Sequence, residues 1–298
     1  MAISQEKINT MVQTLRNEQL DTQLYNNVET ALEESLKLVS ENVGIDYNKL
    51  NFFMAGDHVL DTNIGKETPL VMFVSIKQNK KEMLAYKSYN KLSKRARKFS
   101  GNTFQNVITA EYLAEKLFNT LANQLTQDDK LYVTKNIVIV NLNKSLKIKI
   151  IVGYNFEGNF EYDYLNKTHT TNFLKLMQEF DKKQDATKNF YDMVRILRSI
   201  DHEMALLGAI HTKSYDTLHF IETLVYNVPD ELLIDSNFYN AFLKTLNYLK
   251  NADYNNFILP DGKQPMFDSK NKDDKNLYKI KTFLESIEFF YNYFNRLY

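Results

Sequence analysis

The residues that could do chemistry are concentrated between two apolar runs, in the stretch from Phe52 to Lys77. The first run ends at Gly56, and the second begins at Leu70 and is rich in β-branched and aromatic residues. Short apolar runs bounded by Gly or Pro are typical of buried strands. The segment between the runs contains carboxylates, whose oxygens are the ligands that divalent cations prefer. These carboxylates are Asp57, Asp61 and Glu67.

The same stretch resembles the signature of the nucleotidyltransferase superfamily, which has the DNA polymerase beta-like fold. More narrowly, it is similar to the branch that contains CCA-adding, oligoadenylate-synthase-like and bacterial cyclic-oligonucleotide synthases. In that family a Gly-Ser turn precedes a Gly-Thr-x-Ile-like segment, and an Asp-x-Asp pair lies on the next strand. Here Gly56 and Asp57 are at the place of the Gly-Ser turn, and Thr62 begins the Thr-x-Ile match. The resemblance implies that Gly56, Asp57 and Thr62 are candidates for binding a nucleotide or its phosphates.

The carboxylates of the family motif are absent from their expected positions. The Asp-x-Asp pair falls at Pro69 and Val71, and a third Asp on the later strand falls at Lys149. Nucleotidyl transfer in this family uses two divalent ions, and none of these three side chains can be their oxygen ligand. The resemblance therefore predicts no catalytic residue and no metal at these positions. Lys149 is instead a candidate for binding a phosphate.

A second match lies downstream, in the segment that runs from Phe220 to Pro229, FIETLVYNVP. Synthases of this branch carry a similar segment at the end of a helix in their C-terminal helical domain. The resemblance also places a phosphate-contacting cation on an earlier helix, for which Arg195 and Arg198 are the candidates. Each is equally well explained as an ordinary exposed arginine. Glu222 is expected to be a half-buried acid that caps or pairs with a neighbour.

The sharpest charge asymmetry is in residues 77–98, which contain nine basic residues and one acid. One interpretation is a basic patch for the phosphates of a nucleotide or RNA, with Tyr86 and Tyr89 stacking on bases. The other is a solvated connection between elements. The residues of the candidate basic patch are Lys87, Lys91, Lys94, Arg95, Arg97 and Lys98.

The elements that must position these residues predict an α+β protein. Apolar residues at helical spacing predict one long helix or two joined helices over residues 4–42, and another helix over 111–126. Alternating runs predict two strands within residues 131–154, and residues from 186 onward are helical. We expect a nucleotidyltransferase-like mixed sheet flanked by helices, followed by a helical domain. The expected domains are residues 1–165, with the N-terminal helix, and residues 166–298.

Composition excludes several classes of protein. The chain has 298 residues with 37 basic and 37 acidic side chains, so its net charge does not indicate nucleic acid or membrane as a partner. It has no cysteine, which excludes disulfides and thiolate metal sites, and its five histidines lack zinc-like spacing. No apolar run is long enough to span a bilayer and the N-terminus lacks a signal sequence, so we expect a cytoplasmic protein.

Three functional hypotheses follow from the sequence. The first is a catalytically inactive relative, a pseudo-nucleotidyltransferase without cofactor, that binds a nucleotide, a nucleic acid or a protein. The second is an active NTP-dependent, Mg-assisted nucleotidyltransferase whose metal ligands are displaced to Asp57, Asp61 and Glu67. The third is a structural subunit, or a homo-oligomer, that reuses the fold for assembly. The sequence favours the first, because all three expected carboxylates are missing.

Overall fold

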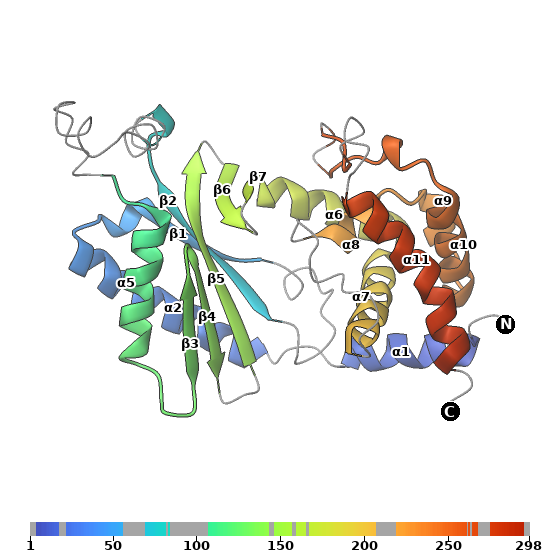
Figure 1. Cartoon of the computed structure of the whole chain (residues 1–298), viewed down its shortest axis with the longest axis horizontal. Coiled ribbons are helices and arrows are strands. Elements are labelled where there is room, and N and C mark those ends of the chain that lie inside the picture. The colour runs from blue at the N-terminus through green and yellow to red at the C-terminus, as the bar shows by residue number, and fades with distance from the viewer. Residues whose placement is uncertain are drawn as a thin grey trace. The chain divides into compact units, whose positions relative to one another are not determined.

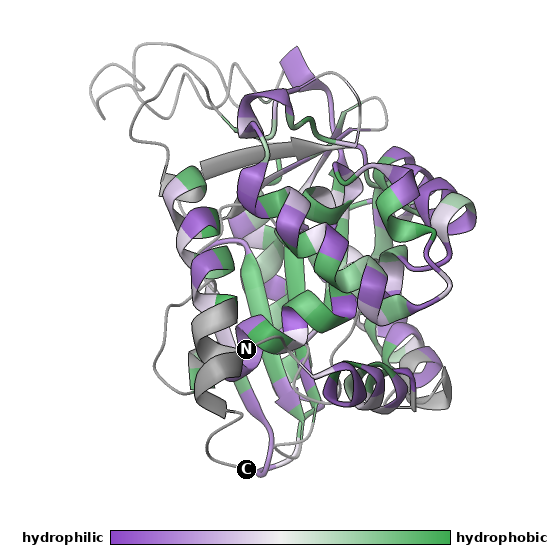
Figure 2. Ribbon diagram, turned by 90° about the vertical axis from the view of Figure 1, so that its right-hand side faces the viewer, coloured by the Kyte–Doolittle hydropathy of each residue, from purple (hydrophilic) through white to green (hydrophobic). Residues whose placement is uncertain are grey.

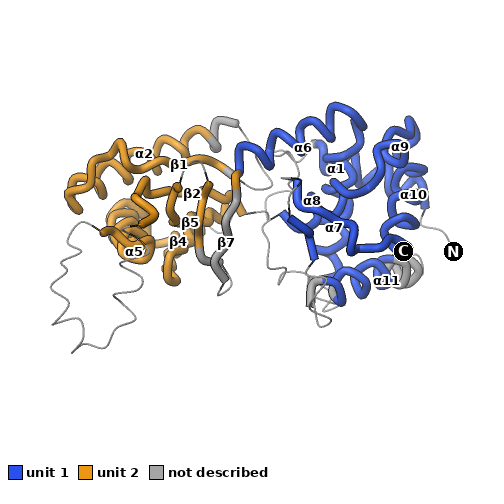
Figure 3. Tube along the Cα trace, turned by 90° about the horizontal axis from the view of Figure 1, so that it is seen from above, with its two compact units in different colours: residues 1–20, 56–68, 173–298 blue, residues 21–55, 69–172 orange. Residues whose placement is uncertain are grey.

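The computed structural model describes residues 4–17, 22–55, 69–81, 83, 107–142, 146–156, 159–164, 167–206, 219–260, 262, 264–267 and 275–294. The chain divides into two compact units (Figure 3). One unit comprises residues 21–55 and 69–172 and contains the sheet. The other comprises residues 1–20, 56–68 and 173–298, and its described elements are helical. The expected α+β fold, a mixed sheet flanked by helices and followed by a helical domain, is confirmed.

In its described residues, the sheet unit contains two long helices and seven strands (Figure 1). The helices are α2 (Thr22–Val43) and α5 (Ala110–Ala122). The strands are β1 (Leu50–Ala55), β2 (Leu70–Lys77), β3 (Lys130–Thr134), β4 (Ile137–Leu142), β5 (Leu146–Phe156), β6 (Asn159–Tyr164) and β7 (Lys167–Thr171). The strand order is β1-β2-β5-β4-β3, and β6 joins β5 to β7.

The middle of the sheet is the parallel pair β2–β5, and the other strand pairs are antiparallel. Every residue of β2 except Lys77 is buried. A strand that is covered on both faces reads as a continuous apolar run rather than an alternating one. This is why the run from Leu70 predicts the central strand correctly.

One face of the sheet is apolar and packs against α5, which contacts β3, β4 and β5. α5 begins at an N-cap, where the Thr109 hydroxyl accepts a hydrogen bond from the Tyr112 backbone N–H at 3.1 Å. Its apolar side chains recur every three or four residues and are buried, and each buried leucine stabilises the fold by about 2 kcal/mol. The buried residues of α5 are Ala110, Leu113, Ala114, Leu117 and Leu121.

The helical unit has one continuous apolar core. Its helices are α1 (Gln5–Asn17), α6 (Phe173–Thr187), α7 (Phe190–Leu206), α8 (Phe220–Tyr226), α9 (Asp230–Leu233), α10 (Phe238–Asn251) and α11 (Lys275–Phe294). α7 contributes the largest continuous buried stripe and contacts α1, α6, α8 and α11. The helices in Figure 2 alternate hydrophobic and hydrophilic segments, as one-sided burial requires.

The N-terminal stretch forms two helices, which is one of the two expected arrangements. Three other details differ from the sequence-based expectations. The helix α1 packs in the helical unit, where Ile8, Val12 and Leu15 join the core. The predicted first strand of residues 131–154 is a hairpin, because Lys135 has a left-handed φ of 52° and reverses the chain between β3 and β4. Residues 159–171 add β6 and β7 to the sheet. The domain boundary at residue 165 stays a prediction.

Among the described residues, no helix is both long enough and apolar enough to cross a membrane.

Gly153 is the position of β5 where the close approach of β6 requires glycine. A Cβ atom there would lie 2.5 Å from the Glu161 carbonyl oxygen and 2.7 Å from the Phe160 ring. We predict that Gly153→Ala lowers the free energy of unfolding by about 2 to 3 kcal/mol, because backbone and a packed ring must both shift. Chemical denaturation measures this difference.

The control for this prediction is Gly44→Asn, just beyond the end of α2. Gly44 has a φ of 70°, and no described atom outside its immediate neighbours lies within 4 Å of the position that a Cβ atom would take. Asparagine tolerates this conformation, so the variant should lose less than about 1 kcal/mol. A loss at Gly153 no greater than that at Gly44 would show that β6 moves away freely.

Candidate functional site

The strand register brings two of the three expected carboxylate positions together. Val71 on β2 and Lys149 on β5 are Cα partners in the parallel pair, and Pro69 directly precedes β2. Lys149 is also the register partner of Ile139 on β4. One end of the β2–β5 pair therefore carries a proline, a valine and a lysine where the resemblance expects a cluster of acids.

Lys149 has an unusual environment for a lysine. Its side chain is half-buried on a strand whose next residue, Ile150, is fully covered. Burial lowers its pKa to about 8, and repulsion from Lys147 contributes in the same direction. At neutral pH the Lys149 side chain is protonated in most molecules, so Lys149 is a half-buried cation.

The residues at these positions do not fit the metal ions that the resemblance implies. Pro69 and Val71 have no side-chain oxygen, and the Lys149 ammonium repels a cation. Within the described ranges, no group of three or more His, Asp or Glu side chains is placed to hold a metal ion. The predicted absence of a metal stays a prediction, because the loop acids belong to a part of the chain that is not described.

Several candidate residues lie outside the described residues. They are Gly56, Asp57, Asp61, Thr62 and Glu67 of the motif, and the basic-patch residues Lys87, Lys91, Lys94, Arg95, Arg97 and Lys98. Their roles stay predictions.

Both candidate arginines of α7 form ion pairs inside the helical unit. Arg195 is 4% exposed and donates to Asp192 Oδ1 at 2.8 Å. Asp192 also accepts hydrogen bonds from Arg16 of α1, so one carboxylate ties α1 to α7. Arg198 donates to Glu222 Oε1 of α8 at 2.5 Å. The predicted phosphate contact of these arginines stays a prediction, and the structure gives each an internal carboxylate.

Glu222 is the most deeply buried carboxylate of this cluster. Its side chain is 0% exposed, not half-buried as expected, and His219 Nδ1 lies 3.7 Å from Oε1. Burial alone raises the pKa of Glu222, but Arg198 and His219 outweigh it and lower the pKa to about 2. The expectation that Glu222 pairs with a neighbour is confirmed, and its partner is Arg198.

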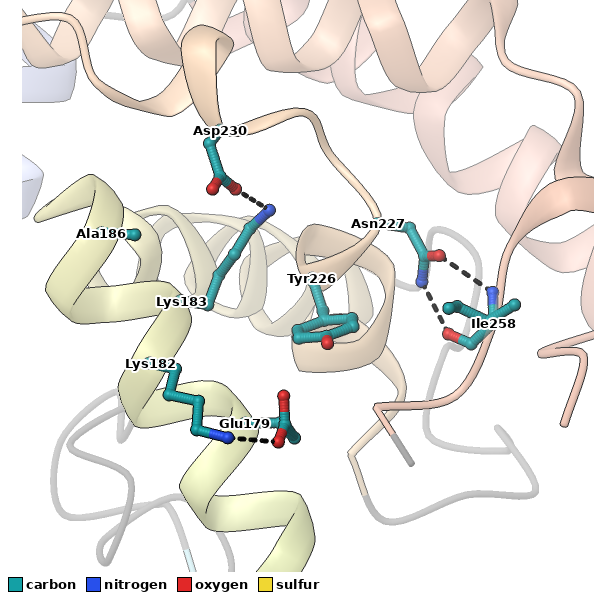
Figure 4. A pocket seen from close by; sticks show the side chains of 8 residues that line it. All are labelled: Glu179, Lys182, Lys183, Ala186, Tyr226, Asn227, Asp230 and Ile258. Carbon is teal, nitrogen blue, oxygen red and sulfur yellow. Dashed lines mark hydrogen bonds and ion pairs between the residues drawn. The ribbon is translucent and has the colours of Figure 1, made fainter. Parts of the chain in front are cut away.

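The helical unit also has an open groove of about 430 Å³ beside Tyr226 (Figure 4). Lys183 Nζ lies 5.8 Å from the centre of the Tyr226 ring and pairs with Asp230, and Lys182 pairs with Glu179 at 2.7 Å. Asn227 donates to the Ile258 carbonyl at 2.9 Å and accepts from its N–H at 2.9 Å. Tyr226 and Asn227 belong to the second sequence match, but the groove was not predicted. Lys182 and Lys183 come from α6, far before that match in the sequence, and no sequence pattern connects the two segments.

Comparison with known proteins gives one family match. Residues 178–292 match the model of the cGAS/DncV-like nucleotidyltransferase C-terminal helical domain. A cyclic nucleotide synthase, CdnE01 of Staphylococcus haemolyticus, is 32% identical over 110 residues, which cover 34% of this chain and 36% of that protein. The match thus spans about a third of either protein.

Solved structures with a similar fold include those of a CdnE cyclic dinucleotide synthase and a CdnC protein. The CdnE cyclic dinucleotide synthase of Elizabethkingia meningoseptica, solved with GTP and Apcpp, covers 95% of this chain and 97% of its own, with a TM-score of 0.68 and 16% identity. The match to the CdnC protein of Escherichia coli, solved in a complex with HORMA-deltaN, covers 88% of this chain and 81% of the CdnC chain, with a TM-score of 0.57 and 13% identity. The resemblance found in the sequence is confirmed by the family match and by these folds.

We predict that Glu222→Gln lowers the free energy of unfolding by about 3 to 5 kcal/mol at pH 7, because it leaves Arg198 buried without a counter-charge. The depressed pKa means that the Glu222 carboxylate stabilises the fold above its unfolded pKa near 4.5. That stabilisation is lost as the pH falls towards 2. Urea denaturation at several pH values should show this loss in the wild type and not in Glu222→Gln.

The matched control is Asp185→Asn, which removes a solvent-exposed carboxylate beside Lys188 in the same unit. Surface ion pairs contribute little, so this variant should unfold like the wild type. Equal stability of both variants would show that the Glu222–Arg198 pair does not hold α7 to α8.

We predict that Lys149→Met raises the free energy of unfolding at pH 7 by about 2 to 3 kcal/mol, because burying the ammonium costs stability. In the wild type this cost is relieved as the pH rises from 8 to 10.5, so stability from this group increases with pH. The variant should lack that increase. Lys147→Met removes only the repulsion from this exposed neighbour and leaves the Lys149 ammonium buried, so it should raise the free energy of unfolding by less than Lys149→Met does and should keep the increase with pH.

Proposed function

We propose that this chain catalyses NTP-dependent nucleotidyl transfer, as a member of the cyclic-oligonucleotide synthase branch of the nucleotidyltransferases that it resembles. The observation that carries this proposal is the agreement of two independent matches. The helical unit matches the C-terminal domain of cGAS/DncV-like nucleotidyltransferases, and the fold of a CdnE cyclic dinucleotide synthase covers 95% of the chain.

The active transferase now ranks above the inactive binding protein, which the sequence alone had favoured. The missing carboxylates favoured an inactive binding protein, whereas the relatives with assigned activities are named as synthases. Those names support an enzyme more than a binding module. They do not identify the nucleotide that this chain uses.

The acidic loop is the part of the chain that would supply metal ligands. Since Pro69, Val71 and Lys149 cannot bind a divalent ion, Asp57, Asp61 and Glu67 are the carboxylates nearest in sequence to the missing pair. A divalent ion would neutralise the triphosphate. The transfer itself joins a ribose hydroxyl oxygen to the α-phosphorus, releases pyrophosphate and gives up the hydroxyl proton.

The second candidate function is nucleotide binding without transfer. One specific observation favours it: the described end of the β2–β5 pair carries a lysine and no carboxylate. Nothing in the described residues favours the third hypothesis, a purely structural subunit. Protein partners of the kind seen for the CdnC relative remain a proposal for this chain.

The test of the proposal is product formation. We predict that purified protein, incubated with Mg²⁺ or Mn²⁺ and the four NTPs, forms phosphodiester-linked nucleotides that ion-exchange chromatography and mass spectrometry detect. Asp57→Asn and Asp61→Asn should each lower the rate at least 100-fold, because each would remove a charged metal ligand. Asp185→Asn, an exposed acid on α6, is the control and should retain full activity.

Absence of product from any NTP mixture would contradict the transferase. If nucleotides still raised the melting temperature of such an inactive protein, the second candidate would replace it. Full activity of both loop variants would show that the metal ligands lie elsewhere.

A further inference from the structure

The two faces of the sheet differ sharply in composition. Along β2, β4 and β5, the residues of one face are apolar and buried, as Met72, Val138 and Ile150 illustrate. Tyr154, on the same face of β5 as Ile150, accepts a hydrogen bond from the Ala110 N–H of α5 at 2.8 Å, so α5 covers this face. Successive side chains on a strand point to opposite faces, so the register assigns every remaining residue of these strands to the other face.

That other face has an aromatic end and a basic end. Phe73 stacks on Phe53 at 5.5 Å between ring centres and meets Phe160 edge-on at 4.8 Å. Phe73 pairs with Ile151 in register, two residues along β5 from Lys149. Lys149 therefore lies next to a tightly packed aromatic cluster on the same face of the sheet.

The charged residues that the described parts of β1 to β5 place on this face are all lysines. The register puts Lys130, Asn141 and Lys147 in one row across β3, β4 and β5, and Lys149 in the next row. Strand geometry places the Cα atoms of Lys147 and Lys149 about 7 Å apart and those of Lys130 and Lys147 about 10 Å apart. The fourth lysine, Lys77, lies at the opposite end of β2.

This arrangement is unusual in a chain with no net charge. Three lysines share one end of this sheet face, and the described parts of β1 to β5 place no carboxylate on the face. Like charges at this spacing repel each other, and an anion with several negative charges would relieve the repulsion. The polyphosphate chain of a nucleotide has the matching charge and length.

We propose that Lys130, Lys147 and Lys149 bind the polyphosphate of a nucleotide directly, so that the nucleotide binds without a divalent cation. The inference rests on the proposed use of NTPs and specifies how this chain holds them. A divalent ion is then required for transfer and not for binding. Ammonium groups suit this role because they donate charge-assisted hydrogen bonds to phosphate oxygens.

The experiment is calorimetric titration of ATP into the purified full-length chain, in excess EDTA and again in Mg²⁺. We expect the dissociation constant in EDTA to stay within about threefold of its value in Mg²⁺. Lys149→Met and Lys147→Met should each weaken binding in EDTA by about fivefold or more, because each removes a charged hydrogen-bond donor. Lys149→Arg keeps the charge and should retain binding.

The matched control is Lys77→Met, an exposed lysine on the same face at the far end of β2, which should bind ATP like the wild type. Inorganic tripolyphosphate should compete with ATP, and adenosine should not. Thermal unfolding of each variant verifies that it is folded before titration.

Several results would overturn the inference. They are loss of binding in EDTA, unchanged affinity in the folded Lys147→Met and Lys149→Met variants, equal weakening by Lys77→Met, and failure of tripolyphosphate to compete with ATP. Product formation in Mg²⁺ together with loss of binding in EDTA would overturn only this inference and leave the transferase intact. Binding in EDTA without product in Mg²⁺ would support this inference and contradict the transferase.

Discussion

The parallel pairing of β2 with β5 is the interaction on which the sheet unit depends. β2 is buried on both faces, and β5 joins it to the β4–β3 hairpin and to β6. Because a one-residue slip would exchange the two faces of a strand, this register keeps the apolar residues under α5 and the lysines on the opposite face. The same register brings Val71 beside Lys149. Fold and candidate site are thus consequences of one strand pair.

The helical unit depends on a different kind of interaction. Two carboxylates that are almost inaccessible to solvent, Asp192 and Glu222, bind arginines from α1 and α7. A buried ion pair adds little net stability compared with apolar packing. Removing one of its two partners, however, leaves the other charge buried without a counter-charge, which destabilises the fold. Such pairs therefore fix which helices are neighbours. This assigns a structural role to Arg198, which the family resemblance alone would describe as a phosphate ligand.

Clear apolar patterns in the sequence predicted the elements that carry them, and the predictions failed where such patterns carry no information. The continuous apolar run from Leu70 predicted β2, and the helical spacing of the leucines predicted α5. The stripes of α1 and α2 look alike, so periodicity could not show that they pack into different cores. The reversal at Lys135 was missed because alternation continues through the turn. Of the ion pairs, Asp192 with Arg195 is visible as a three-residue spacing, whereas Arg198 and Glu222 are 24 residues apart.

Lys149 shows why an absent motif can still be informative. A hydrophobic residue at this position would extend the apolar surface beside Phe73 and Ile151, and it would avoid the cost of burying an ammonium group. Selection for stability alone would therefore not favour lysine here. Residues that violate the local packing pattern at such a cost are expected at functional sites. A lysine at the position where the resemblance expects a carboxylate is what the proposed direct binding of phosphate would require.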